Sequence, residues 1–370
     1  MKIGIPKEIK DQENRVALTA RGARVLVDSG HSVDVQSGAG LGSGFSDEDY
    51  AEAGATLCSA EQAWDAEFVM KVKEPEESEY PYLHKQFLFT YFHLSGVNKR
   101  LTETLLRDET IAIAYETVED ESGRLPLLAP MSAVAGNMAI AMGSYYLAKF
   151  NHGRGVQLGE VLGQRHGKVV VVGDGVVGYH AARTADAMGA NVFICGLDDE
   201  REAEFKRDIS PNVNFVLSRP ENVAREVKDA DLVVGAVLLR GARATHLVSE
   251  DMVRSMQAGA VIVDVSIDQG GCVETARPTS HSEPVYLKHG VTHYCVTNMP
   301  GAYPRTSTIA LTNATLPYAM KLADKGLAAL REDTGFAKGV NTCRGYVTYK
   351  PVAQDLGLME RYTPFLSLST

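Results

Sequence analysis

The chain has 370 residues, with 47 Asp plus Glu against 37 Lys plus Arg, which gives a formal net charge of −10 when histidines are neutral. This length predicts two domains that bury enough surface to fold without a disulfide or a metal. The acidic balance disfavours a nucleic acid or an anionic membrane as partner, and five scattered cysteines indicate a reducing, cytoplasmic setting rather than a disulfide framework or a zinc site.

Short apolar runs alternate with helical stretches through the first 115 residues. The predicted strands are 2–5, 31–35, 68–72, 87–91 and 111–115. Thr19 and Ser46 are predicted to cap two of the intervening helices. Alternating strands and helices are typical of a parallel sheet that is covered on both faces. The glycine-rich stretch 38–44 lacks the spacing of a nucleotide fingerprint and is expected to be a flexible loop.

An uncharged segment, 127–148, leads into a second series of strands and helices. Because it contains proline, glycine and polar residues, a buried helix is a better interpretation than a membrane span. The predicted strands that follow are 168–172, 192–195, 213–216, 232–236 and 260–263. The stretch 307–326 is helical in pattern, although Pro317 should kink or interrupt it. We expect this stretch to return to the first domain and to close a cleft between the two.

The pattern therefore predicts an α/β chain of two Rossmann-like, doubly wound parallel-sheet domains with a cleft between them. The first domain would combine residues 1–128 with 307–370. The second would comprise residues 129–306 and contains the strongest cofactor signal in the sequence.

That signal is the run Gly173-Asp174-Gly175-Val176-Val177-Gly178, which directly follows four valines and precedes a helical stretch. Strand, glycine turn and helix in this order are typical of a dinucleotide fingerprint. We expect a tight turn at Gly173, room for the pyrophosphate at Gly175 and close helix packing at Gly178. The amino terminus of the helix would bind the phosphates through its N–H groups.

One element of the fingerprint is missing. The second strand should end in an acid that binds the adenosine ribose, but it ends Cys195-Gly196-Leu197 and the acids follow only at Asp198 and Asp199. Glycine removes the usual barrier to a 2′-phosphate, and Arg201 lies close enough in sequence to meet one, whereas the neighbouring acids oppose it. We expect NAD to be preferred with NADP as an alternative, and Gly196→Asp to sharpen the preference for NAD.

Ten stretches occur in one order along nearly the whole chain: IGIPKE with Glu13 and Arg15, MKVKEP at 70–75, FTYFHL at 89–94, IAYETV at 113–118, LPLLAPMS at 125–132, the fingerprint, ADLVVGAV at 230–237, VDVSIDQGG at 263–271, VTNMPGA at 296–302 and TST at 306–308. In these the sequence resembles the L-alanine dehydrogenases, which share ancestry with the soluble nucleotide-binding domain of proton-translocating transhydrogenase. His93 and Asp268 favour the dehydrogenases, because the transhydrogenase domain carries neither.

The resemblance implies a role for individual residues. Arg15 and Lys73 would bind the substrate carboxylate in the first, substrate-binding domain. His93 would act as acid and base, and Asp268 would complete the catalytic pair. The substrate site would also include Met131 and Asn298. The cofactor contacts carried over from the family would be Ser132, Gly173, Gly175, Gly178, Ser218, Val237 and Asn298. We also include Val176, Val177, Gly196, Leu197, Arg201 and Asp268 in the expected cofactor site.

The activity implied by the resemblance is reversible, NAD-dependent oxidative deamination of L-alanine to pyruvate and ammonium by a cytoplasmic homo-oligomer, often a hexamer. The alternatives are the nucleotide-binding subunit of a NAD(P) transhydrogenase, a dehydrogenase for another small amino acid, and a nucleotide-binding regulator with a degenerate site. Alanine-dependent NADH formation would distinguish alanine dehydrogenation from these alternatives.

Three candidate residues also have ordinary structural interpretations. Arg15 lies in a charged run that could be solvated. His93 lies among Phe89, Phe92 and Leu94 and could be a buried, hydrogen-bonded core histidine. Asp268 precedes two glycines and could simply form a turn.

Three other residues depart from the family pattern. Asn137 stands where arginine is common, and Arg240 stands where proline is common. Tyr303 replaces a smaller apolar residue and would alter the preferred substrate size if it faced the pocket.

Overall fold

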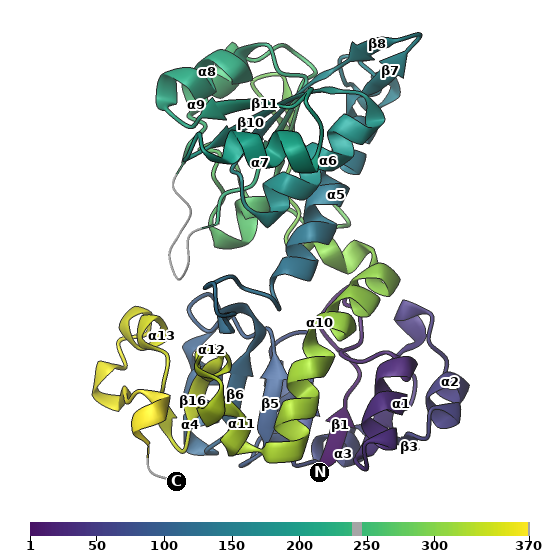
Figure 1. Cartoon of the computed structure of the whole chain (residues 1–370), viewed down its shortest axis with the longest axis vertical. Helices are drawn as coiled ribbons and strands as arrows, with labels where there is room; N and C mark the ends of the chain where they lie inside the picture. Colours follow the sequence, from purple (N-terminus) through teal and green to yellow (C-terminus); the bar gives the residue numbers. More distant parts are fainter. Residues whose placement is uncertain (239–245, 369–370) are drawn as a thin grey trace. The chain divides into compact units, whose positions relative to one another are not determined.

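The computed structural model describes residues 1–238 and 246–368, which form two compact units (Figure 1). Unit 1 is Met1–Met131 with Tyr303–Thr370, and unit 2 is Ser132–Ala302. The boundaries expected from sequence, at 128–129 and 306–307, lie a few residues from these. Arg240 lies outside the described residues.

Unit 1 is built on an eight-stranded sheet in the order β17-β16-β6-β5-β4-β1-β2-β3. The strands are β1 (Lys2–Ile5), β2 (Ser32–Gln36), β3 (Thr56–Cys58), β4 (Phe68–Met70), β5 (Phe87–Thr90), β6 (Ile111–Ala114), β16 (Val340–Cys343) and β17 (Tyr346–Val347). The first six are parallel and follow the 3-2-1-4-5-6 order of a doubly wound fold. The added edge, β16 and β17, is antiparallel and was not predicted.

The helices of unit 1 are α1 (Ala20–Asp28), α2 (Asp47–Glu52), α3 (Ala60–Trp64), α4 (Lys99–Arg107), α10 (Pro304–Lys325), α11 (Leu327–Glu332), α12 (Thr334–Ala337) and α13 (Lys350–Asp355). Thr19 caps α1 and Ser46 caps α2, as predicted. Helix α10 belongs to unit 1, as expected, but it continues through Pro317 without a break. The expected interruption at Pro317 is therefore wrong, and the alternative, a kink at Pro317, stays a prediction.

The glycine-rich stretch 38–44, which was expected to be a flexible loop, contains the short helical turn η1 (Leu41–Ser43). The hydroxyl of Ser43 donates to the carbonyl of Asn14 at 2.9 Å, and Arg305 of α10 donates to the carbonyl of Gly44 at 2.7 Å. A Cβ at Gly42 would lie 2.7 Å from the Asn14 carbonyl oxygen, so a glycine is needed for this close approach. These contacts attach the stretch to the loop that follows β1.

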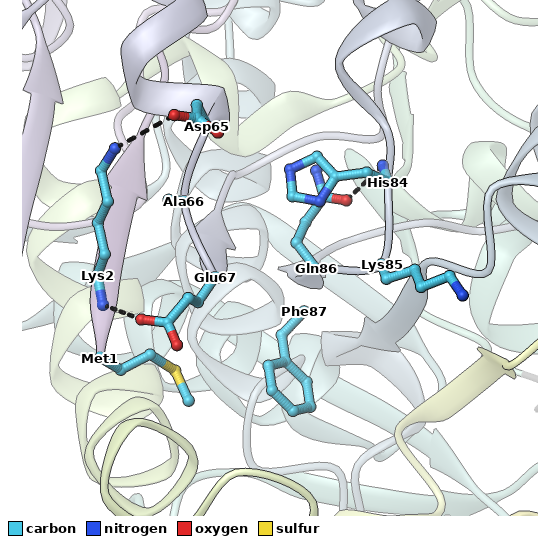
Figure 2. A pocket seen from close by; sticks show the side chains of 9 residues that line it. All are labelled: Met1, Lys2, Asp65, Ala66, Glu67, His84, Lys85, Gln86 and Phe87. Atoms are coloured by element: carbon cyan, nitrogen blue, oxygen red, sulfur yellow. Dashed lines mark hydrogen bonds and ion pairs between the residues drawn. The ribbon is translucent and has the colours of Figure 1, made fainter.

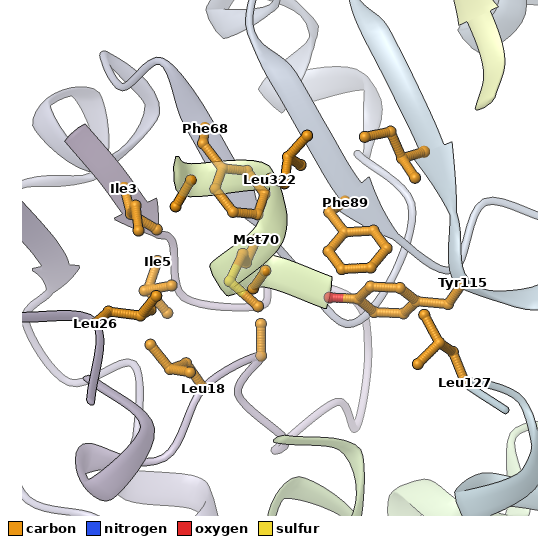
Figure 3. Close-up of a cluster of buried hydrophobic side chains, with 14 of the residues drawn as sticks. Ile3, Ile5, Leu18, Leu26, Phe68, Met70, Phe89, Tyr115, Leu127 and Leu322 are labelled. Atoms are coloured by element: carbon orange, nitrogen blue, oxygen red, sulfur yellow. The ribbon is translucent and has the colours of Figure 1, made fainter. Parts of the chain in front are cut away.

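The sheet of unit 1 is covered on both faces. Ile3 and Ile5 alternate with residues on the opposite face, and with Phe68 and Phe89 they pack beneath Leu322 of α10 (Figure 3). A second buried cluster contains Trp64, Val69, Leu88 and Leu105, among others. Burial on both faces explains why these strands are continuous apolar runs.

Unit 2 is built on a seven-stranded sheet in the order β11-β10-β9-β12-β13-β15-β14. The strands are β9 (Lys168–Val172), β10 (Asn191–Gly196), β11 (Asn214–Leu217), β12 (Leu232–Gly235), β13 (Val261–Asp264), β14 (Val285–Lys288) and β15 (Val291–Tyr294), with a separate hairpin of β7 (Gly159–Val161) and β8 (Gln164–His166). Its parallel strands wind in the same 3-2-1-4-5-6 order as those of unit 1. Strand β14 is antiparallel and joins β15 through a turn with positive φ at His289 and Gly290.

The helices of unit 2 are α6 (Val176–Met188), α7 (Arg201–Asp208), α8 (Pro220–Lys228) and α9 (Glu250–Ser255), and α5 (Ala129–Leu147) enters it from unit 1. Helix α5 is the predicted uncharged helix, but Asn137 and Tyr145 on it are exposed, so only part of its surface is buried. Asn137 accepts a hydrogen bond from Thr184 of α6 at 2.8 Å. In the described ranges, no helix has the length and apolarity needed to span a membrane.

His293 on β15 is a fully buried polar residue in the core of unit 2. Its Nε2 lies 2.7 Å from the hydroxyl of Thr275, and its Nδ1 lies 3.0 Å from the carbonyl oxygen of Val291. Burial lowers the pKa of His293 from 6.5 to about 4, because the charged ring would lose its water, and the nearby Lys288 also lowers it. The folded protein therefore holds this ring neutral.

Because the pKa is lower in the folded state than in the unfolded state, the stability that neutral His293 contributes is present above about pH 6.5 and is lost as pH falls toward 4. This lowering of the pKa corresponds to a decrease of about 2 to 3 kcal/mol in the free energy of unfolding at pH 4.5. Urea unfolding at pH 7.5 and 4.5 measures this decrease. Between these two pH values, His293→Gln should lose less stability than the unaltered protein. An equal loss in both would contradict the assignment.

Candidate active site

In both sheets the winding direction reverses between the first and fourth strands, and ligands of such folds bind outside the carboxyl ends of the strands at this point. In unit 1 the reversal lies between β1 and β4, and in unit 2 between β9 and β12. The candidate residues follow strand ends at these two edges: Arg15 after β1, Lys73 after β4 and His93 after β5 in unit 1, and Gly173 after β9, Val237 after β12, Asp268 after β13 and Asn298 after β15 in unit 2.

Arg15 is buried, with 2% of its surface exposed, and so it does not belong to a solvated charge run. Its Nε and Nη2 donate to the two carboxylate oxygens of Glu13 at 2.7 and 2.5 Å, and its Nη1 lies 3.2 Å from the sulfur of Met131. Burial disfavours the charged guanidinium, but Glu13 outweighs this effect and raises the pKa of Arg15. Two of the guanidinium nitrogens of Arg15 therefore face Glu13 rather than the space where a substrate carboxylate would bind.

A small cavity of about 80 Å³ adjoins Arg15. It is lined by Lys7, Glu8, Glu13, Asn14, Arg15, Gly38, Ala39, Leu41 and Gly42. The η1 turn thus forms part of the wall of the cavity beside this cation.

Lys73 is half-buried and follows a segment fixed by buried charges. Lys71, two residues earlier, lies 3.1 Å from Glu8 and 2.9 Å from Glu79, and the backbone N–H of Val72 donates to Glu8 at 2.6 Å. Burial opposes the ammonium charge of Lys71, but the two carboxylates outweigh it and raise the pKa of Lys71. Glu8 therefore joins the loop after β1 to the loop that carries Lys73.

His93 is exposed, so the interpretation as a buried core histidine is wrong. Its backbone adopts a positive φ of 46°, and its N–H donates to Glu116 at 2.6 Å. The imidazole stacks parallel to the buried ring of Tyr91 at a centroid distance of 6.0 Å, and Tyr91 donates its hydroxyl proton to the carbonyl of Leu127. These contacts hold the ring at the carboxyl end of β5 while leaving it open to solvent.

Asp268 is also exposed and lies in η5 (Val265–Gln269). One of its carboxylate oxygens accepts the backbone N–H of Asn298 at 3.3 Å, so these two candidates meet within unit 2. Beneath them, the fully buried carboxylate of Asp264 accepts the backbone N–H groups of Ser266, Cys272 and Val273 at 2.9 to 3.1 Å. Asp264 thereby shapes the turn that presents Asp268.

The fingerprint turn has the geometry expected of a dinucleotide site. Gly173 has φ of 116°, and a Cβ at Gly178 would lie 2.0 Å from the Gly173 oxygen, which forces helix and turn into close packing. At Gly175 a Cβ would meet no atom within 4 Å, so the space before α6 is open. Among the described residues, no side chain caps this helix at Gly175, so its amino-terminal N–H groups are available to an anion. The turn therefore fits a pyrophosphate.

The remaining cofactor candidates lie around the same edge. Val176 and Leu197 are exposed, whereas Val177, Ser132 and Ser218 are half-buried. The N–H of Val237 donates to Ser266 at 2.9 Å, which links the loops after β12 and β13. Tyr303 is 43% exposed and immediately precedes α10.

Several site-forming residues were missed from the sequence. Glu8, Glu13, Glu116 and Asp264 each fix the loop of a candidate residue. Three of them carried a signal near a strand end: Glu8 and Glu116 follow β1 and β6 within three residues, and Asp264 is the last residue of β13, whereas Glu13 lies farther along the loop after β1. Lys71 carried a similar signal as a cation directly after β4.

A larger cavity, of about 480 Å³, lies at the opposite edge of unit 1 (Figure 2). It is lined by Met1, Lys2, Asp65, Ala66, Glu67, His84, Lys85, Gln86 and Phe87. Because β1, β4 and β5 begin there, it is at the amino ends of the strands, where parallel sheets do not usually bind ligands. Its size alone does not make it the active site.

The winding gives unit 2 a Rossmann-type fold, and the fingerprint turn is typical of dinucleotide-binding domains of that fold. Residues 4–135 match the model "Alanine dehydrogenase/PNT, N-terminal domain", and residues 139–350 match "Alanine dehydrogenase/PNT, C-terminal domain". The chain belongs to the alanine dehydrogenase/PNT family.

Individual relatives match nearly the whole chain. Alanine dehydrogenases of Staphylococcus haemolyticus and Bacillus subtilis are each 51% identical to it, covering 97% and 96% of this chain and 97% and 95% of their own lengths. A solved L-alanine dehydrogenase superposes with a TM-score of 0.92 at 48% identity, covering 96% of this chain and 99% of its own. A transhydrogenase from Sinorhizobium meliloti, with a TM-score of 0.81 and 23% identity, covers 94% of this chain and 100% of its own, and shares the fold.

Two single substitutions separate the structural and binding roles of the fingerprint glycines. Gly178→Ala should lower the free energy of unfolding by about 1 to 3 kcal/mol, because its methyl group would overlap a backbone oxygen. Gly175→Ala should leave stability unchanged but weaken NADH binding, because its methyl group enters the open space before α6. Thermal unfolding and NADH titration measure both effects. Equal stability of the two variants would contradict this packing.

Proposed function

We propose that this chain catalyses the reversible oxidative deamination of L-alanine to pyruvate and ammonium with NAD. One observation carries the proposal beyond the family relationship: exposed His93 lies on the same edge of unit 1 as the cations Arg15 and Lys73, and unit 2 carries a dinucleotide fingerprint. An amino-acid dehydrogenase needs cations for the carboxylate and a proton carrier near the amine. Close relatives named alanine dehydrogenase support the choice of substrate.

In the proposed site, Lys73 and the Nη1 side of Arg15 bind the substrate carboxylate and fix its orientation. His93 accepts a proton from the substrate ammonium and releases it to solvent. After oxidation it accepts a second proton, from the water that attacks the iminium carbon, and returns it to the nitrogen that leaves as ammonia. Asp268 stabilises the positive charge of the iminium. When bound, NAD accepts the hydride from Cα. The fingerprint N–H groups at the start of α6 hold its pyrophosphate.

NAD is the proposed cofactor, with NADP as the alternative. We also propose that the enzyme is a cytoplasmic homo-oligomer. The five free cysteines support a reducing setting, and the family relationship supports self-association.

A spectrophotometric screen tests the proposed reaction. The purified protein should form NADH from NAD in the presence of L-alanine faster than with any other L-amino acid, and should consume NADH with pyruvate and ammonium. Hydride exchange between NADH and an NADP analogue without alanine turnover would instead make it a transhydrogenase subunit. If the protein binds NADH but catalyses neither reaction, it is a nucleotide-binding regulator.

Two variants test the carboxylate contact. Lys73→Met should lower kcat/KM for alanine at least about tenfold, the scale of one charged contact, with NADH affinity unchanged. Arg15→Lys should have a similar effect. Arg15→Ala is less informative, because removing one partner of a buried ion pair costs about 3 to 5 kcal/mol of stability. Lys85→Met, in the cavity at the opposite sheet edge, is the control and should remain fully active. Full activity of Lys73→Met would refute its role.

Two further variants test the acid–base pair. His93→Ala should lower kcat by about 100-fold or more, while leaving stability unchanged because the ring is exposed. Asp268→Asn keeps the shape but removes the charge, so turnover should largely disappear while NADH still binds. Asp251→Asn removes an exposed charge elsewhere in unit 2 and serves as the control. An Asp268→Asn enzyme with unaltered kcat would exclude the proposed charge stabilisation.

A further inference from the structure

The end of β10 carries no acid of its own, but the carboxylate of Asp174, from the fingerprint turn, lies beside it. A Cβ at Gly196 would lie 2.3 Å from the ring of Phe215 and 2.9 Å from the carboxylate oxygen Oδ2 of Asp174. Gly196 therefore borders a carboxylate that comes from the loop after β9 rather than from its own strand. The expected benefit of Gly196→Asp is corrected, because an acid there would collide with Phe215 and repel Asp174.

Arg201 holds this carboxylate in place. Its Nη1 donates to Oδ2 of Asp174 at 2.9 Å and to the Asp174 carbonyl oxygen at 2.6 Å. Its Nε donates to Glu204 at 3.2 Å, and its guanidinium lies over the ring of Phe205 at 5.1 Å. The guanidinium of Arg201, which was expected to be close enough to meet a 2′-phosphate, is thus paired with Asp174 and Glu204.

Asp174 retains the capacity to bind a ribose. An ionised carboxylate offers about four acceptor sites on two oxygens, and Arg201 uses one of these oxygens. The side chain of Asp174 is 16% exposed, so it is shielded but reachable. Paired ribose hydroxyls are donors that such a carboxylate accepts, whereas a 2′-phosphate beside it would be repelled.

A second, independent feature marks a polar ligand at the same edge. The buried hydroxyl oxygen of Ser218 has no hydrogen-bond partner in the part of the chain that the structure describes. The backbone N–H of Ser218 donates to the Gly196 oxygen at 2.7 Å, which places this residue directly beside the end of β10. Buried hydroxyls are normally satisfied, so an unpartnered one is a candidate contact for a bound polar group.

From these contacts we propose that Asp174 binds the adenosine ribose hydroxyls and selects NAD over NADP, with Arg201 as its positioning residue. The inference rests on the proposed dinucleotide cofactor but not on alanine as substrate. It makes the second residue of the glycine turn, rather than the strand end, the determinant of cofactor choice.

The test measures binding of NADH and NADPH by titration calorimetry in the absence of amino acid. The unaltered protein should bind NADH more tightly. Asp174→Asn keeps the shape of the side chain. It should weaken the binding of NADH by about tenfold, because one charged contact is lost, and should strengthen the binding of NADPH, because Arg201 is released. Asp174→Ser should act in the same direction, and thermal unfolding should show that both variants remain folded.

Two controls separate Asp174 from its neighbours. Asp199→Asn removes an exposed acid from the loop after β10 and should leave the ratio of the two dissociation constants within about twofold of the original. Arg201→Gln should weaken the binding of NADH without strengthening the binding of NADPH. In the double variant with Asp174→Asn, NADPH should no longer bind more tightly than it binds to the unaltered protein. A purely structural role of Arg201 would weaken both cofactors equally and leave their ratio unchanged.

The outcomes distinguish this inference from the proposed reaction. An unchanged ratio in folded Asp174→Asn, a shift produced by Asp199→Asn instead, or equal affinity of the unaltered protein for both cofactors would overturn it. NADH binding and the predicted shift without alanine oxidation would support the role of Asp174 while refuting the proposed reaction.

Discussion

Parallel strands must be joined by crossovers, so all their carboxyl ends meet at one edge of the sheet. The positions of Arg15, Lys73, His93, Asp268 and the fingerprint turn depend on that constraint. In each unit the reversal of winding separates the loops after the first and fourth strands. In unit 1 this places Arg15 and Lys73 on neighbouring loops, and in unit 2 it opens the space before α6 beside Gly175. The strand order of each sheet thus determines where the candidate residues lie, whatever their side chains are.

Buried charges then fix the loops that the topology brings to these edges. Glu8 binds both Lys71 and the backbone next to Lys73, Glu13 holds Arg15, and Asp264 organises the turn of Asp268. Each buried group is satisfied by partners, since an unpaired buried charge would be strongly destabilising. The exposed groups His93 and Asp268 can therefore be held in place without being buried themselves, which reconciles a reactive, solvent-accessible side chain with a defined position.

The sequence was sufficient for features that depend on local pattern and insufficient for those that depend on distant contacts. Most of the parallel strands, the Thr19 and Ser46 caps and the turn at Gly173 follow from periodicity and local chemistry. The parallel strands β3 and β15 were not predicted. The antiparallel strands β14, β16 and β17 were not predicted either, because β14 and β16 mix polar with apolar residues and β17 has only two residues. The burial of Arg15 and the obstruction at Gly196 could not be predicted, because Met131 and Phe215 approach these positions only through the fold.

The central claim is that this protein moves a hydride from the α-carbon of alanine to a nicotinamide. Its most direct test follows that hydrogen: the enzyme is incubated with NAD and L-alanine deuterated at Cα, and the recovered cofactor is analysed by NMR. The account predicts deuterium at C4 of the nicotinamide, with one pyruvate formed per labelled cofactor. An unlabelled cofactor, or reduced cofactor formed without pyruvate, would contradict it.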